Sequence, residues 1–405
     1  MPSIAIVVNS FPKLSESFII NKVRLLSENG FDVTVITHAD TKELTVGGND
    51  KSLNINIIKS PSVLSIRNKI LKLLVALIFN FKEAFQLYAL LRKDKLSILN
   101  YIKSLLLYIP FMKKYDIVHF PFSGIGIAYL KLFPIVNKNM LTYVSCRGSA
   151  EKIRPLHDLS RKTELFKLFQ LVDRVHCVSN EMVGICIKYG LPHTKAFVNR
   201  PAIDINHFQG KNNNSIPKST NNMNLVTIGR LHWVKSYETI LLAIQILKTK
   251  KIVVRLHIAG DGPELEKLIY ISHLLQIEEQ VNFLGKQTPE QISNLLEQSD
   301  IYVHSSISEG ISNAVIEAMA MELPVVCTNI GGMNELIDDG VDGILVPVFQ
   351  PKEISDSILW LIENPDIRIK LGKQARIKII KEFSLERQLN VYLDEYNTTI
   401  SLKKQ

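Results

Sequence analysis

Two acidic residues near the C-terminal end of the chain, Glu309 and Glu317, are separated by seven residues. Between them, a loop containing glycine and serine leads into a segment rich in helix-favouring residues, which Ser312 or Asn313 can cap. Eight helical residues span about 12 Å, so the two carboxylates cannot grip one metal ion or act as a catalytic dyad. They could instead hold the two ends of a ligand whose middle is a diphosphate, which describes a nucleotide sugar.

This segment is bounded by two short apolar runs, residues 300–304 and 323–327, which predict buried strands. A strand followed by a loop and a helix N-terminus forms an anion site, because unpaired N–H groups and the positive end of the helix dipole point at the loop. The residues predicted to line this site are Gly310, Ile311, Ser312 and Asn313.

A basic segment earlier in the chain, residues 229–236, follows another predicted strand at 225–228. Arg230 can bind two phosphate oxygens with its planar guanidinium, and Lys235 adds a compact second charge. Taken alone, an arginine and a lysine in a loop would be ordinary solvated charges. Because they follow a strand and precede the two glutamates, they predict a diphosphate site that begins at Gly229.

These motifs together resemble the retaining glycosyltransferases of family 4. Glu309 and Glu317 match the E-x7-E motif of that family, and residues 229–236 match its G-R-L-x-x-x-K-G segment, with Ser236 where glycine is usual. The similarity is strongest between residues 225 and 346 and extends loosely over nearly the whole chain. The stretches that continue the match are Glu317-Ala318-Met319-Ala320, Leu323-Pro324-Val325-Val326 and Gly331-Gly332-Met333-Asn334-Glu335-Leu336.

The resemblance implies the GT-B fold, in which two Rossmann-like, doubly wound α/β domains face each other across a cleft. A β-α-β rhythm that begins at residue 4 and starts again at residue 225 also predicts doubly wound sheets, with ligands at the C-terminal strand ends. The expected parts are an acceptor-binding domain at 1–212, a polar linker at 213–222, a nucleotide-sugar-binding domain at 223–383 and a helix at 384–405 that packs back on the first domain.

The resemblance also implies roles for the candidate residues. Glu309 would bind the sugar hydroxyls and Glu317 the ribose, while Arg230 and Lys235 would stabilise the departing diphosphate. The candidate catalytic residues are therefore Glu309, Arg230 and Lys235. Main-chain groups around Gly285 would hold the nucleotide base. The positions expected to contact the donor are Glu317, Gly310, Ile311, Ser312, Asn313, Gly285, Gly229 and Arg147.

The N-terminal stretch from Phe11 to Ile19 resembles a signature of family 4 enzymes of exopolysaccharide synthesis, of the colanic-acid type. It makes Ser15 and Glu16 candidates for the acceptor side, together with His119 at the end of another predicted strand. The competing interpretation is structural. Ser15 would then cap a helix, Glu16 would lie in its first turn, and His119 would only end a strand.

Two positions depart from the family pattern. Arg147 stands where most members have a histidine that contacts the donor sugar, and a neutral hexose offers a buried guanidinium little to pair with. We expect either a uronic acid donor or an acidic acceptor group at Arg147, or else a structural ion pair. Glu322 stands where glycine is commoner, and it carries strain of ~1–2 kcal/mol if its turn requires positive φ.

Composition narrows the class of protein. The chain has 405 residues, 46% of them hydrophobic and 21% charged, which suits a globular protein of two domains. Its net charge is +9, but no zinc pattern, RNA-recognition signature or long basic run indicates nucleic acid. Four scattered cysteines predict buried thiols in a reducing cytosol, and the N-terminus lacks the pattern of a signal peptide. The basic, leucine-rich segment 63–93 fits either a membrane-interface helix or helices packed on the sheet.

Together these features predict a cytoplasmic enzyme that moves a hexose from a nucleotide diphosphate sugar to a glycan or lipid-linked glycan, with retention of configuration. It would work at the inner face of the membrane if residues 63–93 bind lipid. We favour a UDP-sugar over a GDP-sugar, and we expect no metal ion or other cofactor, since no D-x-D motif is present. The alternatives are a catalytically silent, nucleotide-sugar-binding regulatory subunit and a sugar-nucleotide 2-epimerase on the same fold.

Overall fold

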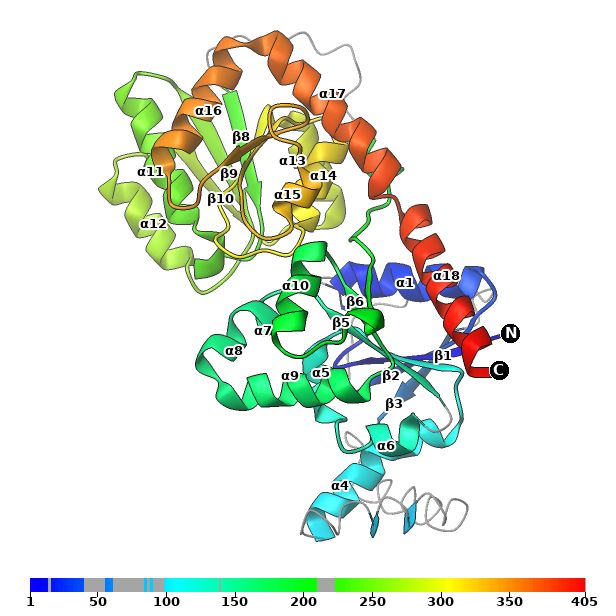
Figure 1. Ribbon diagram of the computed structural model, residues 1–405. Helices are drawn as coiled ribbons and strands as arrows, with labels where there is room; N and C mark the ends of the chain where they lie inside the picture. The colour runs from blue at the N-terminus through cyan, green and yellow to red at the C-terminus, as the bar shows by residue number, and fades with distance from the viewer. Residues whose placement is uncertain are drawn as a thin grey trace. The chain divides into compact units, whose positions relative to one another are not determined.

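The computed structural model describes residues 1–13, 16–39, 55–60, 84–85, 88–89, 98–137, 140–209 and 223–404. The chain divides into two compact units, which are Met1–Asn199 with Leu389–Gln405, and Arg200–Gln388. Each unit is built around its own sheet, with helices packed against it (Figure 1). The predicted linker at 213–222 lies outside the described residues.

The N-terminal unit contains a seven-stranded parallel sheet in the order β3-β2-β1-β4-β5-β6-β7. The winding direction reverses between β1 and β4, which is where doubly wound folds bind ligands. The strands are β1 (Ser3–Val8), β2 (Asp32–Thr37), β3 (Ile55–Lys59), β4 (Ile117–Phe120), β5 (Leu141–Cys146), β6 (Arg174–Cys177) and β7 (Ala196–Val198). The helices are α1 (Ser17–Glu28), α4 (Ile98–Tyr108), η3 (Ile109–Met112), α5 (Ser123–Ala128), α6 (Phe133–Val136), α7 (Ser149–Lys152), α8 (Arg154–His157), α9 (Leu159–Leu171), α10 (Asn180–Lys188) and η4 (His193–Lys195).

The C-terminal unit contains a six-stranded parallel sheet in the order β10-β9-β8-β11-β12-β13, with its reversal between β8 and β11. The strands are β8 (Met223–Ile228), β9 (Val254–Ala259), β10 (Val281–Gly285), β11 (Ile301–His304), β12 (Val325–Thr328) and β13 (Ile344–Val346). The helices are η5 (Trp233–Lys235), α11 (Tyr237–Thr249), α12 (Leu265–Leu274), η6 (Glu278–Gln280), α13 (Pro289–Gln298), α14 (Asn313–Ala320), α15 (Met333–Leu336), α16 (Pro351–Glu363), α17 (Pro365–Glu382) and α18 (Leu385–Lys404), which continues into the N-terminal unit.

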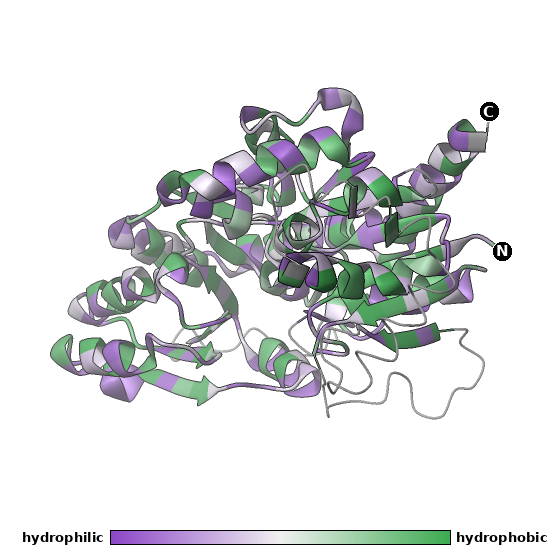
Figure 2. Ribbon diagram, turned by 90° about the horizontal axis from the view of Figure 1, so that it is seen from below, coloured by the Kyte–Doolittle hydropathy of each residue, from purple (hydrophilic) through white to green (hydrophobic). Residues whose placement is uncertain are grey.

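The predicted fold class, two doubly wound α/β domains, is confirmed. Its physical basis is visible in Figure 2, where the strands are drawn mostly in hydrophobic colours and the helices mix both kinds. Central strands such as β4, β5, β11 and β12 are buried along their whole length. Strands covered on both faces by helices read as continuous apolar runs, and the sequence shows such runs.

The last helix, α18, contributes to the core of the N-terminal unit from Leu389 onward. Tyr392 and Tyr396 are buried there. Glu395 on the same helix accepts two hydrogen bonds from the guanidinium of Arg174 at the start of β6. A bidentate arginine–carboxylate pair of this kind fixes orientation as well as adding energy.

The four cysteines are all buried and free, as predicted. Within the part of the chain that the structure describes, no helix has both the length and the apolar character that a membrane crossing requires. Most of the segment 63–93 lies outside the described residues, so its contact with a membrane stays a prediction.

Candidate active site

Loops from three neighbouring strands are joined at the carboxyl end of the C-terminal sheet. The Ile307 amide donates to the Val234 carbonyl at 2.9 Å, which connects the loop after β11 to the loop after β8. The hydroxyl of Thr328, the last residue of β12, donates to the Ser306 carbonyl at 2.6 Å. These bonds bring segments far apart in the sequence into one site.

The centre of this site is an ion pair between Lys235 and Glu309, whose Nζ and Oε2 atoms are 2.5 Å apart. Ser306 donates to the same carboxylate oxygen at 3.2 Å, and His304 Nε2 lies 3.6 Å from it. Burial alone would raise the pKa of Glu309, but the Lys235 charge and the hydrogen bond from His304 hold it well below its usual range. Glu309 is therefore an anion at neutral pH.

Glu317, one turn into α14, is in the opposite situation. Its carboxyl group makes no hydrogen bond or ion pair with any other described side chain. Burial raises the pKa of Glu317 to about 7, because no neighbouring positive charge compensates for the loss of water. Near neutral pH this carboxyl group therefore exchanges readily between its two protonation states, and its capacity to accept hydrogen bonds is unused.

The N-terminus of α14 lacks a side-chain cap. Ser312 occupies the N-cap position, as predicted, but its hydroxyl makes no capping hydrogen bond. The Gly310 carbonyl accepts from the Gly332 amide at 2.8 Å, and the Ile311 side chain is buried in the core. A ligand at this loop would therefore meet main-chain groups and the first amides of the helix.

Three glycines lie at the adjoining ends of β8, β9 and β10. The Gly260 amide donates to the Gly285 carbonyl at 2.9 Å, and a Cβ atom on Gly260 would lie 1.8 Å from the Gly229 carbonyl oxygen. Only glycine permits this approach, so Gly229 and Gly285 belong to the same edge of the sheet. Arg230 follows Gly229, is exposed, and forms no hydrogen bond or ion pair with the rest of the described chain.

Arg147 lies after β5, at the carboxyl end of the N-terminal sheet. Its guanidinium carbon is 3.8 Å from the centre of the Phe18 ring, and its Nε is buried without a hydrogen-bond partner. Its main-chain amide and that of Gly148 each donate to Glu151 at 3.2 Å. Among the described residues no carboxylate forms an ion pair with the guanidinium, so the structural ion pair considered as an alternative is not found among them, although the charges of Glu151 and Glu16 act on it.

The acceptor-side candidates are placed differently from one another. Glu16 precedes α1 at its N-cap position, makes no capping bond, and pairs with Lys13 at 2.7 Å. His119 is completely buried, and its Nε2 lies 2.8 Å from the Ser145 hydroxyl, so it positions other groups rather than facing solvent. Ser15 lies outside the described residues.

Three buried polar residues were not predicted from the sequence. His304 and Ser306 surround Glu309, and their signal was their place at the end of a predicted strand just before the glutamate. Lys22 is buried in the N-terminal unit. It follows Phe18 by one helical turn and so shares its face of α1, which a helical-wheel reading would have shown.

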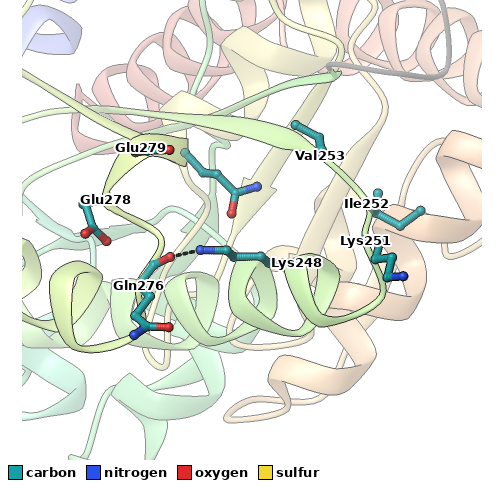
Figure 3. Close-up of a pocket in the computed structure, with 8 residues that line it drawn as sticks. Lys248, Lys251, Ile252, Val253, Gln276, Glu278 and Glu279 are labelled. Atoms are coloured by element: carbon teal, nitrogen blue, oxygen red, sulfur yellow. Dashed lines mark hydrogen bonds between the residues drawn. The ribbon is translucent and has the colours of Figure 1, made fainter.

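A separate hollow of about 470 Å³ lies elsewhere in the C-terminal unit (Figure 3). Its lining immediately precedes β9 and β10, so it lies at the amino ends of these strands, away from Glu309. The side chain of Lys248 donates there to the Gln276 carbonyl. The residues that line it are Lys248, Lys251, Ile252, Val253, Gln276, Glu278, Glu279 and Gln280.

Models of known protein families match both units of the chain. Residues 15–207 match the family model described as Glycosyltransferase Family 4, and residues 209–378 match the one described as Glycosyl transferases group 1.

Individual relatives agree with this result. The chain is 24% identical over 398 residues to the putative colanic acid biosynthesis glycosyltransferase WcaL of Escherichia coli (strain K12). The alignment covers 92% of this chain and 94% of that protein. It is 29% identical over 168 residues to N-acetyl-alpha-D-glucosaminyl L-malate synthase of Bacillus anthracis. That alignment covers 42% of this chain and 43% of that protein. The fold is similar to that of Anabaena HepE, crystallised in complex with UDP, with a TM-score of 0.71 at 17% identity over 98% of this chain and 100% of that one. The chain therefore belongs to the glycosyltransferases that combine a family 4 domain with a group 1 domain, as its motifs predicted.

Proposed function

We propose that this glycosyltransferase moves a hexose from a nucleoside diphosphate sugar to a glycan or lipid-linked glycan, with retention of configuration, in the synthesis of a cell-surface polysaccharide. The observation that carries the proposal is the Lys235–Glu309 ion pair in front of α14, with the unpartnered Glu317 one turn into that helix. A UDP-sugar is the favoured donor. The similar HepE has been crystallised with UDP and with UDP-glucose, and WcaL is named for colanic acid biosynthesis.

The donor would lie along the carboxyl end of the C-terminal sheet. The ribose hydroxyls would donate to Glu317, whose acceptor capacity is otherwise unused. The diphosphate would receive hydrogen bonds from Arg230, from Lys235 and from the first amides of α14. Glu309 would accept from the sugar hydroxyls, and main-chain groups near Gly285 would hold the base.

Transfer requires the bond between the anomeric carbon and the diphosphate oxygen to break while a bond to an acceptor hydroxyl forms on the same face. The acceptor proton would pass to the departing phosphate oxygen. Arg230 and Lys235 would stabilise the negative charge that develops on the diphosphate, an effect that preorganised charges supply without rearrangement. Because Lys235 is paired with Glu309 before the donor binds, it would redistribute its hydrogen bonds between the carboxylate and the phosphate.

A donor panel tests the proposal directly. Purified protein would be incubated with UDP-, GDP- and ADP-sugars, with and without a lipid-linked acceptor fraction, and nucleotide release and labelled product would be measured. We expect release that depends on the acceptor and on one nucleotide, and loss of product with Glu309→Gln. Binding without turnover under every condition would support the silent regulatory subunit instead, and a changed sugar nucleotide without transfer would support an epimerase.

The cellular location follows from the same proposal. Nucleotide sugars are substrates of the cytoplasm, so the enzyme would act there, at the membrane face where a lipid-linked acceptor is presented. Contact through residues 63–93 remains part of this proposal.

A further inference from the structure

A cluster of basic, histidine and tyrosine side chains lies in the N-terminal unit, at the carboxyl end of its sheet. We call it the Lys22–Arg147 cluster, and it comprises Lys22, Arg147, His119, His176 and Tyr392. Its members come from α1, β4, β6, α18 and the loop after β5, and the sheet reverses its winding direction between β1 and β4. This is where an open α/β sheet places a ligand.

Lys22 is a buried lysine without a counter-ion. It is 6% exposed, and its Nζ lies 2.9 Å from His119 Nδ1 and 3.8 Å from the centre of the Tyr392 ring. It forms no ion pair with any aspartate or glutamate in the described ranges. Burial, reinforced by the charge of Arg147, lowers the pKa of Lys22 well below its usual value.

The hydrogen bonds around the two adjoining histidines indicate that both rings are neutral. The Asn199 carbonyl can only accept, so His176 Nε2, 2.7 Å away, carries a proton. His176 Nδ1 then accepts from the Ser145 hydroxyl at 2.8 Å, and that hydroxyl accepts from His119 Nε2 at 2.8 Å. His119 Nδ1 is left as an acceptor, with the Tyr396 hydroxyl at 2.7 Å and Lys22 Nζ at 2.9 Å. Both histidines are thus neutral, and burial lowers the pKa of each.

Arg147 is the second basic side chain of the cluster, and it forms no ion pair with a described carboxylate. The charges of Glu151 and Glu16 act on it without direct contact, and Tyr392 hydrogen-bonds to its guanidinium. The Arg147 guanidinium lies over Phe18, and its Nε is buried and has no hydrogen-bond partner. The two nearest acids are engaged elsewhere. Glu151 accepts from the Ser123 hydroxyl and from main-chain amides, and Glu16 pairs with Lys13.

The groups that face Lys22 come from every element packed around it. They are Arg147 after β5, His119 on β4, His176 on β6, and Tyr392 and Tyr396 on α18. Glu151 on α7 and Glu16 before α1 act on Arg147 instead. No described carboxylate is in direct contact with Lys22 or with the Arg147 guanidinium, and burial drives Lys22 toward its neutral form. Such an arrangement is costly unless an anion occupies it.

We propose that the Lys22–Arg147 cluster binds a phosphate group carried by the acceptor. This inference rests on the proposed function, because it names the chemistry of the acceptor in that reaction. A phosphate dianion matches two positive charges and presents several oxygens to the arginine fork and to the lysine. A single carboxylate would leave one of the two charges unbalanced. Binding would also favour the charged form of Lys22, so that the complex takes up a proton.

The first experiment measures binding to the full chain with its donor site saturated by UDP. The probes are a hexose phosphate, a short-chain prenyl phosphate and glucuronate, titrated by calorimetry. We expect both phosphates to bind more tightly than glucuronate, and Lys22→Met and Arg147→Met each to weaken phosphate binding about ten- to a hundredfold. Lys195→Met is the matched control, because Lys195 lies in the same unit and donates only to carbonyls at the end of α9.

The second experiment counts protons. Calorimetry in buffers of different ionisation heat should show proton uptake on phosphate binding by the wild type and by Lys195→Met, and none by Lys22→Met. Since Lys22→Met replaces a buried amine that has no counter-ion with an apolar side chain of similar shape, we also expect it to raise the Tm while weakening binding. If Lys22 were merely structural, its replacement by methionine would lower both the Tm and the affinity for phosphate.

The outcomes separate the possibilities. Tighter binding of the prenyl phosphate would place the phosphate on a lipid carrier, and tighter binding of the hexose phosphate would place it on a glycan. Equal affinity for glucuronate, or phosphate affinities of Lys22→Met and Arg147→Met that equal the control, would overturn the proposal. UDP binding is measured separately on the same variants, so failure of the donor site cannot be mistaken for failure of this one.

Discussion

Glu309 and Glu317, the two glutamates of one motif, have pKa values that are shifted in opposite directions. Lys235 and His304 keep Glu309 ionised, whereas burial without a partner raises the pKa of Glu317 to about 7. The difference arises because one carboxylate precedes α14, in reach of the loop after β8, and the other lies within the helix. A site with one permanently charged carboxylate and one adjustable carboxyl group suits a ligand whose two ends carry different hydroxyl groups.

Donor binding should depend on pH through Glu317. Ribose hydroxyls donate to the ionised form, so binding of a UDP-sugar releases a proton wherever Glu317 is protonated in the free protein. We therefore expect affinity to be constant above pH about 7 and to fall up to tenfold per unit below it. Calorimetry with UDP-glucose, whose diphosphate does not titrate in this range, measures this. Glu317→Gln should bind weakly and with no such slope, and a slope that survives the substitution would assign it to another group.

Glu317→Gln, which should weaken donor binding, should nevertheless make the folded protein more stable above pH about 7. A carboxyl group whose pKa is raised in the folded state contributes stability at low pH and loses it as the pH rises through about 7. Glu317→Gln should therefore be more stable than the wild type above pH about 7, by about 1–3 kcal/mol, and equal to it below the pKa of an unfolded glutamate. Denaturant unfolding at two pH values shows whether the weak binding reflects a lost contact or a damaged fold.

The Lys235–Glu309 pair should show strong energetic coupling. Lys235→Met leaves a partly buried carboxylate without its main partner, so we expect it to destabilise the protein more than the double variant Lys235→Met/Glu309→Gln does. A coupling of about 1–3 kcal/mol in a four-variant unfolding cycle is expected. All three variants should lose transfer activity. Additive effects on stability would mean that the two side chains are paired in the structure without energetic consequence.

At the scale of elements, the site lies where several loops meet the short helix α14. Two residues in this region adopt a left-handed backbone conformation. Ser236, between η5 and α11, has φ 49°, and Glu322, after α14, has φ 61°. Both stand where family members usually have glycine. The condition set for strain at Glu322 is therefore met, and its Oε1 lies 3.7 Å from Arg376 Nε, an ion pair that offsets part of the strain.

Replacing Glu322 with glycine should stabilise the C-terminal unit. Relief of the left-handed conformation gains ~1–2 kcal/mol, and the greater entropy of glycine in the unfolded chain and the lost ion pair reduce that gain to about 0.5–1 kcal/mol. Glu322→Ala is the control, since it removes the ion pair and keeps the strain, and it should be destabilising. Thermal unfolding measures both. An alanine variant as stable as the glycine variant would show that the backbone carries no strain here.

At the scale of the molecule, each unit provides one cationic site at the carboxyl end of its own sheet. The C-terminal unit contributes Arg230, Lys235 and the N-terminus of α14, and the N-terminal unit contributes Lys22 and Arg147. In the proposed reaction both sites would present positive charge to an anionic group of a substrate, which is one use of the net charge of +9. In that reaction, side chains would supply the charge compensation that many transferases obtain from a divalent cation.

Turnover should accordingly survive chelation. With Arg230, Lys235 and helix amides available to the diphosphate, we expect the rate in excess EDTA to stay within about twofold of the untreated rate. Arg230→Ala should instead lower kcat by about a hundred- to a thousandfold, as loss of a preorganised charge partner does. Complete loss of activity in EDTA that magnesium or manganese restores would contradict this assignment.

The sequence by itself determined the local elements and their order. Apolar runs marked strands such as β1, β8, β11 and β12, and the glycine, serine and alanine pattern around residues 305–320 marked the loop and α14. These features follow from hydrophobic periodicity and from the preferences of neighbouring residues, which act over a few positions along the chain. The motif spacing likewise identified the family before any tertiary contact was known.

Only the tertiary structure decided which charges meet. Lys235 and Glu309 are 74 positions apart, and Lys22 and His119 are 97 apart. Their contacts depend on which strands become neighbours in the sheet and on how deeply each side chain is covered. Burial and distance set the protonation state of a carboxyl group or a lysine, and neither quantity is encoded locally. For this reason the sequence placed Glu309 and Lys235 in one site but could not show that they neutralise each other. Helical spacing puts Lys22 on the face of Phe18, but it could not show that Lys22 lies buried beside Arg147.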